Sequence, residues 1–193
     1  MLLMDLPLTA ANALERIGYL FRMEDQAGGL HPAQWAALRF LDRANRFSRK
    51  PIALTRYLGS TRGTVSQTIN ALERKGLVAR APSKSDARSV DLSITKAGRE
   101  LLRSDPLSAL AGEISLALGE DIGSFGKMLE RVLSQLIMSN SGRAFGQCKA
   151  CRFFEANGGS TTDEPHHCGL LNTGLSDEDS EHICTEFEKL EEV

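Results

Sequence analysis

Apolar residues at helical spacing predict two helices at the start of the chain, over residues 8–25 and from Pro32 to about Phe47. Gly28 and Gly29 separate these helices, because glycine is favoured just past a helix C-terminus. Pro32 fits the first turn of the second helix, where its missing N–H is not needed. The two apolar stripes consist of Leu14, Ile17, Leu20, Phe21, Trp35, Leu38 and Leu41.

Two shorter helices follow, separated by one tight step. Pro51 opens the first of them and Gly59 ends it. Ser60 or Thr61 can cap the second, which runs to about Lys75. Two short helices joined in this way are typical of a helix-turn-helix. The expected buried face of the second helix consists of Val65, Ile69 and Leu72.

A β-hairpin is predicted after the second short helix. Residues 77–80 form a short apolar-rich run, and residues 82–87 are a polar turn. Residues 89–94 alternate apolar and polar side chains, which is the pattern of a half-buried strand. The order of helix, turn, helix and hairpin predicts a winged helix.

The helices predicted after the hairpin are rich in apolar residues. Thr95 caps the first of them, and two more are expected over residues 106–118 and 120–138. Their apolar stripes are wider than that of a surface helix, so these stripes are expected to face a partner chain. The residues concerned are Leu107, Leu110, Ile114, Phe125, Met128, Leu129, Val132, Leu133, Leu136 and Ile137.

The formal net charge of −2 conceals an uneven distribution. Residues 39–103 hold fifteen Lys and Arg but five Asp and Glu, a charge of +10, whereas residues 146–193 hold three against eleven, a charge of −8. The middle segment therefore favours a polyanionic partner, although a solvated charged face is the simpler alternative. No apolar run is long enough for a membrane span and no secretory leader is evident, so we expect a cytoplasmic protein without a membrane partner.

Residues 54–102 contain several motifs in an order that resembles the MarR family of winged-helix regulators. These motifs are Leu58-Gly59, Thr64-Val65-Ser66, Leu72–Val78, Asp86-Ala87-Arg88 and Thr95–Arg99. The resemblance covers roughly residues 8–138. It implies a homodimer formed by the terminal helices, and hence a double-stranded DNA operator that is pseudo-palindromic.

The second short helix and the hairpin carry the expected DNA contacts. With one face buried, the helix presents polar side chains that can bond to base edges and phosphates in a major groove. The hairpin places basic side chains near a minor groove, and the resemblance supports Arg88 there, braced by Asp86. The alternatives are solvent exposure for the helix residues and a structural ion pair for Arg88. The predicted DNA-binding residues are Arg62, Thr64, Ser66, Gln67, Asn70, Lys84 and Arg88.

All four cysteines lie near the C-terminus, in a C-x-x-C pair at Cys148 and Cys151 followed by Cys168 and Cys184. In a protein expected in the cytoplasm, clustered cysteines indicate a metal centre or redox chemistry more than structural disulfides. An all-thiolate set suits zinc or an iron–sulfur cluster, and the count of four does not decide between them.

The residues flanking these cysteines are similar to those of the small iron–sulfur subunits of certain glycyl-radical enzymes. Those subunits in turn resemble high-potential iron–sulfur proteins. The similar segments are Cys151-Arg-Phe-Phe, His167-Cys168-Gly and Cys184-Thr-Glu-Phe. This resemblance implies a [4Fe–4S] cluster on the four cysteines, with structural zinc as the alternative. It also implies that Phe153, Phe154 and Phe187 shield the cluster from water, the alternative being a small hydrophobic cluster. His166, His167 and His182 are expected to surround the site rather than bind metal.

The fold class that follows is mainly α with a small β-hairpin wing (α+β): a winged helix-turn-helix with a helical dimerisation region and a metal-binding tail. A polar boundary at residues 139–142 precedes the tail, which has too few apolar residues to fold unaided. The predicted domains are an N-terminal dimerisation helix (1–31), a winged helix-turn-helix DNA-binding domain (32–104), C-terminal dimerisation helices (105–140) and a four-cysteine metal-binding tail (145–193).

The function predicted from these features is that of a MarR-type transcriptional regulator, a repressor, that senses redox, oxygen or iron status through an iron–sulfur cluster. The alternative is a MarR-type regulator with structural zinc and a small-molecule effector resembling an aromatic acid. An enzyme is not expected, because the sequence offers no glycine-rich nucleotide loop, Ser/His/Asp constellation or nucleophile elbow.

Overall fold

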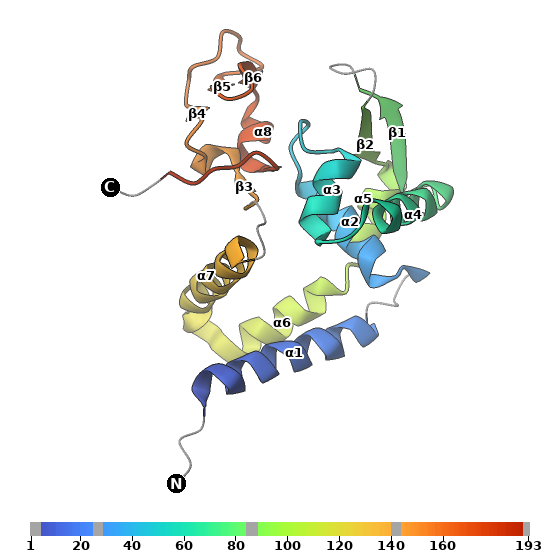
Figure 1. Cartoon of the computed structure of the whole chain (residues 1–193), viewed down its shortest axis with the longest axis vertical. Helices are drawn as coiled ribbons and strands as arrows, with labels where there is room; N and C mark the ends of the chain where they lie inside the picture. The colour runs from blue at the N-terminus through green and yellow to red at the C-terminus, as the bar shows by residue number, and fades with distance from the viewer. Residues whose placement is uncertain (1–4, 25–28, 84–88, 140–143, 191–193) are drawn as a thin grey trace.

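The computed structural model describes residues 5–24, 29–83, 89–139 and 144–190 (Figure 1). The N-terminal and central elements, in chain order, are α1 (Leu6–Glu24), α2 (Pro32–Arg43), α3 (Pro51–Leu58), α4 (Arg62–Arg74), β1 (Val78–Pro82), β2 (Val90–Ile94), α5 (Lys96–Leu102), α6 (Leu107–Leu118) and α7 (Ile122–Ser139). The tail contains β3 (Gly146–Gln147), a 3₁₀ turn (Cys148–Ala150), β4 (Phe154–Glu155), β5 (His166–Cys168), β6 (Thr173–Leu175), α8 (Asp177–Glu181) and β7 (Ile183–Cys184).

One hydrophobic core joins α2, α3, α4, the β1–β2 hairpin and the end of α5. Trp35 and Phe40 of α2 are fully buried in it, as is Leu54 of α3. Burying one such side chain stabilises the fold by about 1.5–3 kcal/mol relative to leaving it exposed. The apolar stripe predicted for α2 is therefore the centre of the winged helix unit.

The step between α3 and α4 forms as the sequence predicts. Gly59 ends α3 with φ of 56°, a left-handed conformation that glycine adopts without a steric penalty. Thr61 is the N-cap of α4, and its side-chain oxygen accepts a hydrogen bond from the Thr64 N–H at 3.2 Å. These local interactions fix where α4 begins and which of its faces is buried.

The wing is an antiparallel hairpin in which Val78 pairs with Ile94. Helix α5 packs against its base, with Thr95 as N-cap accepting from the Gly98 N–H at 3.1 Å. A Cβ atom added at Gly98 would lie 2.7 Å from Ile94 Cγ1 and against the Leu77 carbonyl group. Glycine is required at this position because the helix and the hairpin approach so closely.

Helices α1, α6 and α7 extend away from the winged helix unit (Figure 1). No side chain of α6 or α7 is buried, and Leu133 and Leu136 are 58% and 55% exposed in the single chain. The stripes predicted to face a partner are therefore exposed or half-buried along this part of the described chain. None of the described helices combines the length and the apolar character that crossing a membrane requires.

Helix α2 ends earlier than its apolar pattern predicts. The prediction extended it to about Phe47, which is wrong, because the helix ends at Arg43 and Ala44 is extended. Ala44 forms a parallel bridge with Ile183, and the Asn45 N–H donates to the Ile183 carbonyl oxygen at 3.0 Å. Backbone pairing with a distant segment thus replaces the last turn of the predicted helix.

The tail forms small antiparallel sheets that were not predicted, one pairing β3 with β7 and the other in the order β4–β5–β6. Ile183 of β7 belongs to the core of the winged helix, while Leu175 lies in a second small core beside the cysteines. The tail therefore folds against the rest of the chain, as expected for a segment with few apolar residues of its own.

A partly buried ion pair joins α2 to the segment before α6. Arg39 donates to Asp105 through Nε at 2.7 Å and through Nη2 at 2.5 Å. Burial alone raises the pKa of Asp105, but the hydrogen bonds from Arg39 and the Leu107 N–H, with the charge of Arg39, outweigh it and lower the pKa below its ordinary value. The ionised carboxylate thus stabilises the fold above about pH 4, and this stabilisation is lost as the pH falls through the lowered pKa.

Asp105→Asn is expected to reduce the free energy of unfolding at pH 7 by about 1–3 kcal/mol, because it removes the charge from a carboxylate that accepts two hydrogen bonds from the partly buried Arg39. The difference between variant and wild type should shrink at pH 3. Urea unfolding at pH 7 and pH 3 measures this difference in the free energy of unfolding. Glu100→Gln is the matched control, because the exposed Glu100–Arg103 pair should be worth less than about 1 kcal/mol. An equal effect of the two substitutions would contradict the expectation.

Candidate functional site

The exposed face of α4 carries polar side chains beside the wing. The opposite face is buried, with Val65, Thr68, Ile69 and Leu72 in or against the core. Because the N-cap and this buried face fix the rotation of the helix, the polar face has a defined orientation. The predicted site residues on it, all exposed, are Arg62, Thr64, Ser66, Gln67 and Asn70.

Two of these residues also have contacts within the chain. The Thr64 hydroxyl lies 2.9 Å from that of Thr61, as part of the helix cap. Asn70 Oδ1 accepts a hydrogen bond from the Arg80 guanidinium of β1. Within the described residues, Arg62, Ser66 and Gln67 make no side-chain hydrogen bond, so their polar groups remain available to a ligand.

Arg80 belongs to the same surface and was not among the predicted residues. It also pairs with Glu73 at 3.4 Å, and it lines one groove together with Arg62 and Ser66. The available sequence signal was a basic residue on the strand that directly follows α4. Lys84 and Arg88, predicted for the hairpin turn, lie outside the described residues.

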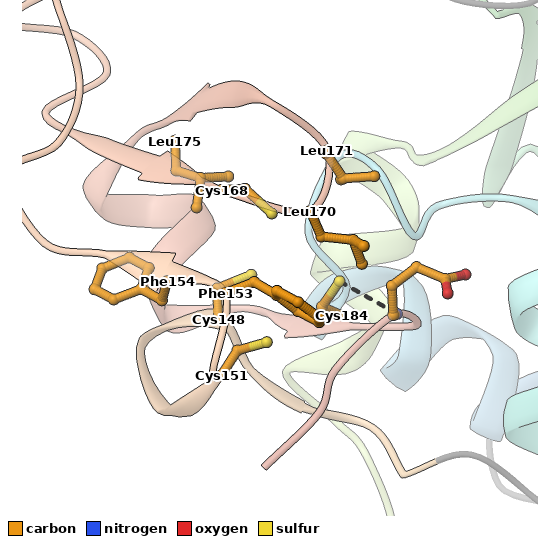
Figure 2. Close-up of a pocket in the computed structure, with 10 residues that line it drawn as sticks. Cys148, Cys151, Phe153, Phe154, Cys168, Leu170, Leu171, Leu175 and Cys184 are labelled. Carbon is orange, nitrogen blue, oxygen red and sulfur yellow. Dashed lines mark hydrogen bonds between the residues drawn. The ribbon is translucent and has the colours of Figure 1, made fainter. Parts of the chain in front are cut away.

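The four cysteines, far apart in the sequence, line one cavity in the tail (Figure 2). Cys148 and Cys151 come from the turn after β3, Cys168 from the end of β5 and Cys184 from β7. All four are free thiols, and only Cys168 is less than nine-tenths buried. Figure 2 shows their sulfur atoms directed toward a common space.

The free volume of the cavity is about 20 Å³, and its walls other than the thiols are almost entirely apolar. Phe153 and Phe154 line it directly, whereas Phe187 packs against the neighbouring small core. Within the described residues, no three His, Cys, Asp or Glu side chains are arranged to hold a single metal ion. The cysteine donors that line this cavity are all sulfur.

The nearby histidines point to carboxylates rather than into the cavity. His166 Nε2 lies 3.0 Å from Asp177 Oδ1, and His167 Nδ1 lies 3.0 Å from Glu155 Oε2. These contacts hold strands β4 and β5 and helix α8 together around the cysteines. That His166, His167 and His182 surround a metal site stays a prediction.

Cys148 and Cys184 form a coupled pair inside the cavity. A hydrogen bond from Cys148 lowers the pKa of Cys184 to about 6 despite its burial, and the Glu186 N–H adds a further bond at 3.4 Å. The same contact with Cys184, together with burial, raises the pKa of Cys148. One thiolate is thus available near neutral pH, and the thiolate is the form that binds metal.

The capped helix with a polar face, preceded by a short helix and followed by a hairpin, defines a winged helix-turn-helix protein. Residues 28–89 match the family model of the MarR family. The fold class predicted from the sequence is thereby confirmed for the winged helix, and residues 28–89 are similar to the MarR family.

Similarity to individual proteins agrees with this assignment. The chain is 36% identical over 93 residues to the transcriptional activatory protein BadR of Rhodopseudomonas palustris, covering 46% of this chain and 53% of BadR. It therefore spans about half the length of that relative. Among solved structures it resembles the transcriptional repressor CouR bound to a 23-mer DNA duplex (26% identity, TM-score 0.55, 69% of this chain and 98% of CouR). It also shares the fold of the regulator BldR from Sulfolobus solfataricus (22% identity, TM-score 0.56, 70% and 99%).

Proposed function

We propose that the protein is a DNA-binding transcriptional regulator, a repressor, that binds a pseudo-palindromic duplex as a homodimer. The observation that carries this function is the exposed polar face of α4, held in one orientation by its N-cap and its buried stripe. A helix with this geometry fits the major groove, and Arg62, Ser66 and Gln67 have unengaged donors and acceptors for base edges and phosphates. The exposed apolar faces of α1, α6 and α7 are suited to the dimer contact.

The charge of residues 39–103 supports this function. Two of the fifteen basic residues, Arg46 and Arg56, pair with tail acids, Arg46 with Glu164 at 2.6 Å and Arg56 with Glu186 at 3.3 Å. Arg62 lies on α4, the helix proposed to enter the major groove and here called the recognition helix. It has no such pair within the described residues. A surface that keeps a free cation beside a helix N-terminus suits a phosphate backbone. The names of BadR and CouR are those of transcriptional regulators, which agrees with this proposal.

Measuring duplex affinity against salt concentration tests DNA binding. A duplex selected from a random-sequence pool by the purified protein is the probe. If the dimer neutralises six or more phosphates, the affinity should fall by about 10³-fold or more between 50 and 200 mM salt. Binding that is insensitive to salt, or no selected sequence at all, would rule out this function.

We further propose that the tail holds a [4Fe–4S] cluster on Cys148, Cys151, Cys168 and Cys184, through which redox, oxygen or iron status is sensed. Four thiols around one apolar cavity are a suitable ligand set, and such a cluster supplies a centre that gains or loses one electron. A single zinc ion needs its ligands within about 2.3 Å of one point, and no three suitable side chains among the described residues are so arranged. The lack of such a group among the described side chains favours the cluster over zinc.

Metal analysis of anaerobically purified protein tests the cluster. About four irons and four sulfides per chain are expected, with charge-transfer absorbance near roughly 400 nm. Stoichiometric zinc in colourless protein would favour the alternative of structural zinc. DNA release that requires an aromatic acid, whatever the state of the cluster, would favour the small-molecule effector.

A further inference from the structure

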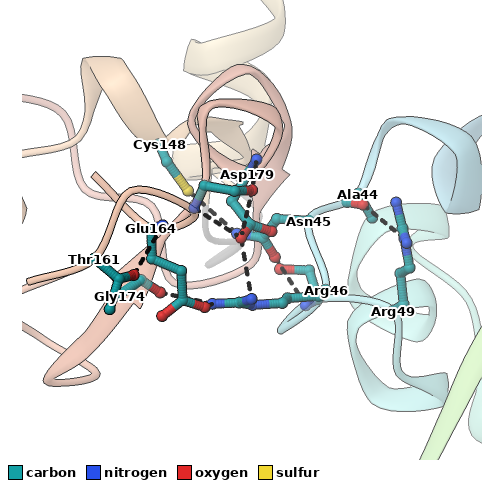
Figure 3. A network of polar contacts seen from close by, with 11 residues as sticks. Ala44, Asn45, Arg46, Arg49, Cys148, Thr161, Glu164, Gly174 and Asp179 are labelled. Carbon is teal, nitrogen blue, oxygen red and sulfur yellow. Dashed lines mark hydrogen bonds and ion pairs between the residues drawn. The ribbon is translucent and has the colours of Figure 1, made fainter. Parts of the chain in front are cut away.

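The turn between α2 and α3, residues 44–50, is where the cysteine tail meets the winged helix (Figure 3). At its rim, the Arg46 guanidinium donates to Glu164 Oε1 and to the Gly174 carbonyl oxygen, each at 2.6 Å. Its Nε lies 3.3 Å from Asp179 Oδ2. Arg46 therefore attaches the β4–β6 sheet and α8 of the tail to this turn.

Beneath Arg46, the side chain of Asn45 is buried, with 1% of its surface exposed. Its Nδ2 donates a hydrogen bond to Cys148 Sγ at 3.2 Å, and its Oδ1 accepts one from the Ser48 N–H at 2.9 Å. Its backbone N–H donates to the Ile183 carbonyl oxygen at 3.0 Å. One residue of the winged helix unit thus contacts a cysteine sulfur and the strand that carries another cysteine.

Ser48 makes the second buried connection. Its side chain is fully buried, and its Oγ accepts a hydrogen bond from the Thr185 N–H at 2.9 Å. Because Asn45 holds Ile183 and Ser48 holds Thr185, both neighbours of Cys184 are attached to the same short turn. Residues 45–48 are thus bonded to Cys148 and to both neighbours of Cys184.

The other side of the turn leads to the DNA-binding face. Arg49 Nε donates to the Ala44 carbonyl oxygen at 2.9 Å, and the Arg49 carbonyl oxygen accepts from the Leu92 N–H of β2 at 2.7 Å. Pro51 then begins α3, which packs against α4. The turn is thus connected by hydrogen bonds to the wing and by the chain itself to the helix-turn-helix.

We propose that Asn45 is the positioning residue that couples the cysteine site to the helix-turn-helix, so that the state of Cys148 sets the affinity for DNA. This inference rests on the proposed function and adds the route by which the tail acts. A sulfur that ligates a metal centre carries more negative charge than a free thiol, and hydrogen bonds to charged acceptors are roughly twice as strong as neutral ones. The Asn45 amide is therefore held more firmly when the site is loaded than when it is empty.

A double-mutant cycle between Asn45→Leu and Cys148→Ala, read out as duplex affinity, tests the coupling in the purified full-length protein. The probe is the duplex selected by the wild type. Each substitution removes one partner of the N–H···S bond, so the two effects on affinity should be non-additive by about fivefold or more. Asn45→Asp, which retains the acceptor for Ser48, gives a second cycle if Asn45→Leu does not fold.

Arg46→Gln is the matched control, because it removes the contacts with Glu164 and Asp179 and leaves Asn45 in place. The quantity compared is the duplex affinity of the loaded protein divided by that of the empty protein. In Arg46→Gln this ratio should equal the wild-type ratio. In Asn45→Leu it should approach one, while the iron content is retained. Additive effects in the cycle, or a wild-type ratio in Asn45→Leu, would overturn the proposed role of Asn45. If the wild-type protein binds the duplex but no iron, the proposed cluster is overturned. The double-mutant cycle measured in the empty protein would still test whether Asn45 and Cys148 are coupled to the duplex affinity.

Discussion

Cys184→Ala is expected to prevent loading of the cysteine site, with the iron content falling from about four per chain to near zero. Cys184 is buried in β7, and its pKa of about 6 makes it the thiolate of the coupled pair. Alanine removes the ligand and leaves the other three thiols around an apolar cavity. The variant should also lose the increase in melting temperature that loading gives to the wild type, because a group that binds only the folded state stabilises that state.

Thr185→Val is the matched control for this experiment. Thr185 is adjacent to Cys184 and equally buried, and its hydroxyl has no hydrogen-bond partner among the described residues. Valine has nearly the same shape, so this variant should keep both its iron and its backbone contact with Ser48. Iron content, sulfide content and melting temperature are measured for the loaded and empty forms. Full iron loading of Cys184→Ala would show that Cys184 is not a ligand.

Gln67→Ala on the recognition helix is expected to weaken binding to the selected duplex by about 5–150-fold and to relax the preference at one base position. Gln67 is exposed on the face of α4 that has unengaged polar groups, and its amide can form two bonds to an adenine edge.

Arg62→Ala should act differently, because Arg62 lies at the helix N-terminus, where a phosphate contact is expected. Its loss should weaken binding to all sequences and lower the salt slope by about one.

Arg103→Ala is the control for both variants. Arg103 is an exposed basic residue of the same positively charged segment, at the end of α5, and it pairs with Glu100 at 3.2 Å. Its removal changes the net charge as Arg62→Ala does. Because Arg103 does not lie on α4, its removal should nevertheless leave the base preference and the salt slope nearly unchanged. Fluorescence anisotropy at several salt concentrations measures all three variants. Equal losses in Arg62→Ala and Arg103→Ala would show that charge alone, and not the position of α4, determines the affinity.

Local interactions explain why the winged helix could be predicted from the sequence. Pro51, Gly59 and Thr61 act on their immediate neighbours, so the ends of α3 and the start of α4 follow from residue type and spacing. The end of α2 did not follow, because it depends on pairing between Ala44 and Ile183. A contact between residues so far apart has no periodic pattern in the sequence.

The same distinction applies to the candidate site. The four cysteines were visible from their type and their concentration in the tail, and the polar face of α4 followed from its buried stripe. Asn45 was not predicted, because its partner Cys148 lies 103 residues away. Arg80 was missed because its contact with Asn70 depends on how the wing lies against α4. Side chains whose role depends on tertiary contacts cannot be recognised from local spacing.

The place of Ile183 in the core of the winged helix has a consequence for biosynthesis. The segment that pairs with it, at Ala44, leaves the ribosome long before Ile183 does. At a synthesis rate of about 5–20 residues per second, this interval is on the order of 10 s. During that time the nascent winged helix exposes the apolar surface that Ile183 later covers. A chain that terminates before the tail therefore releases a winged helix with an unfinished core, which is a substrate for chaperones and proteases.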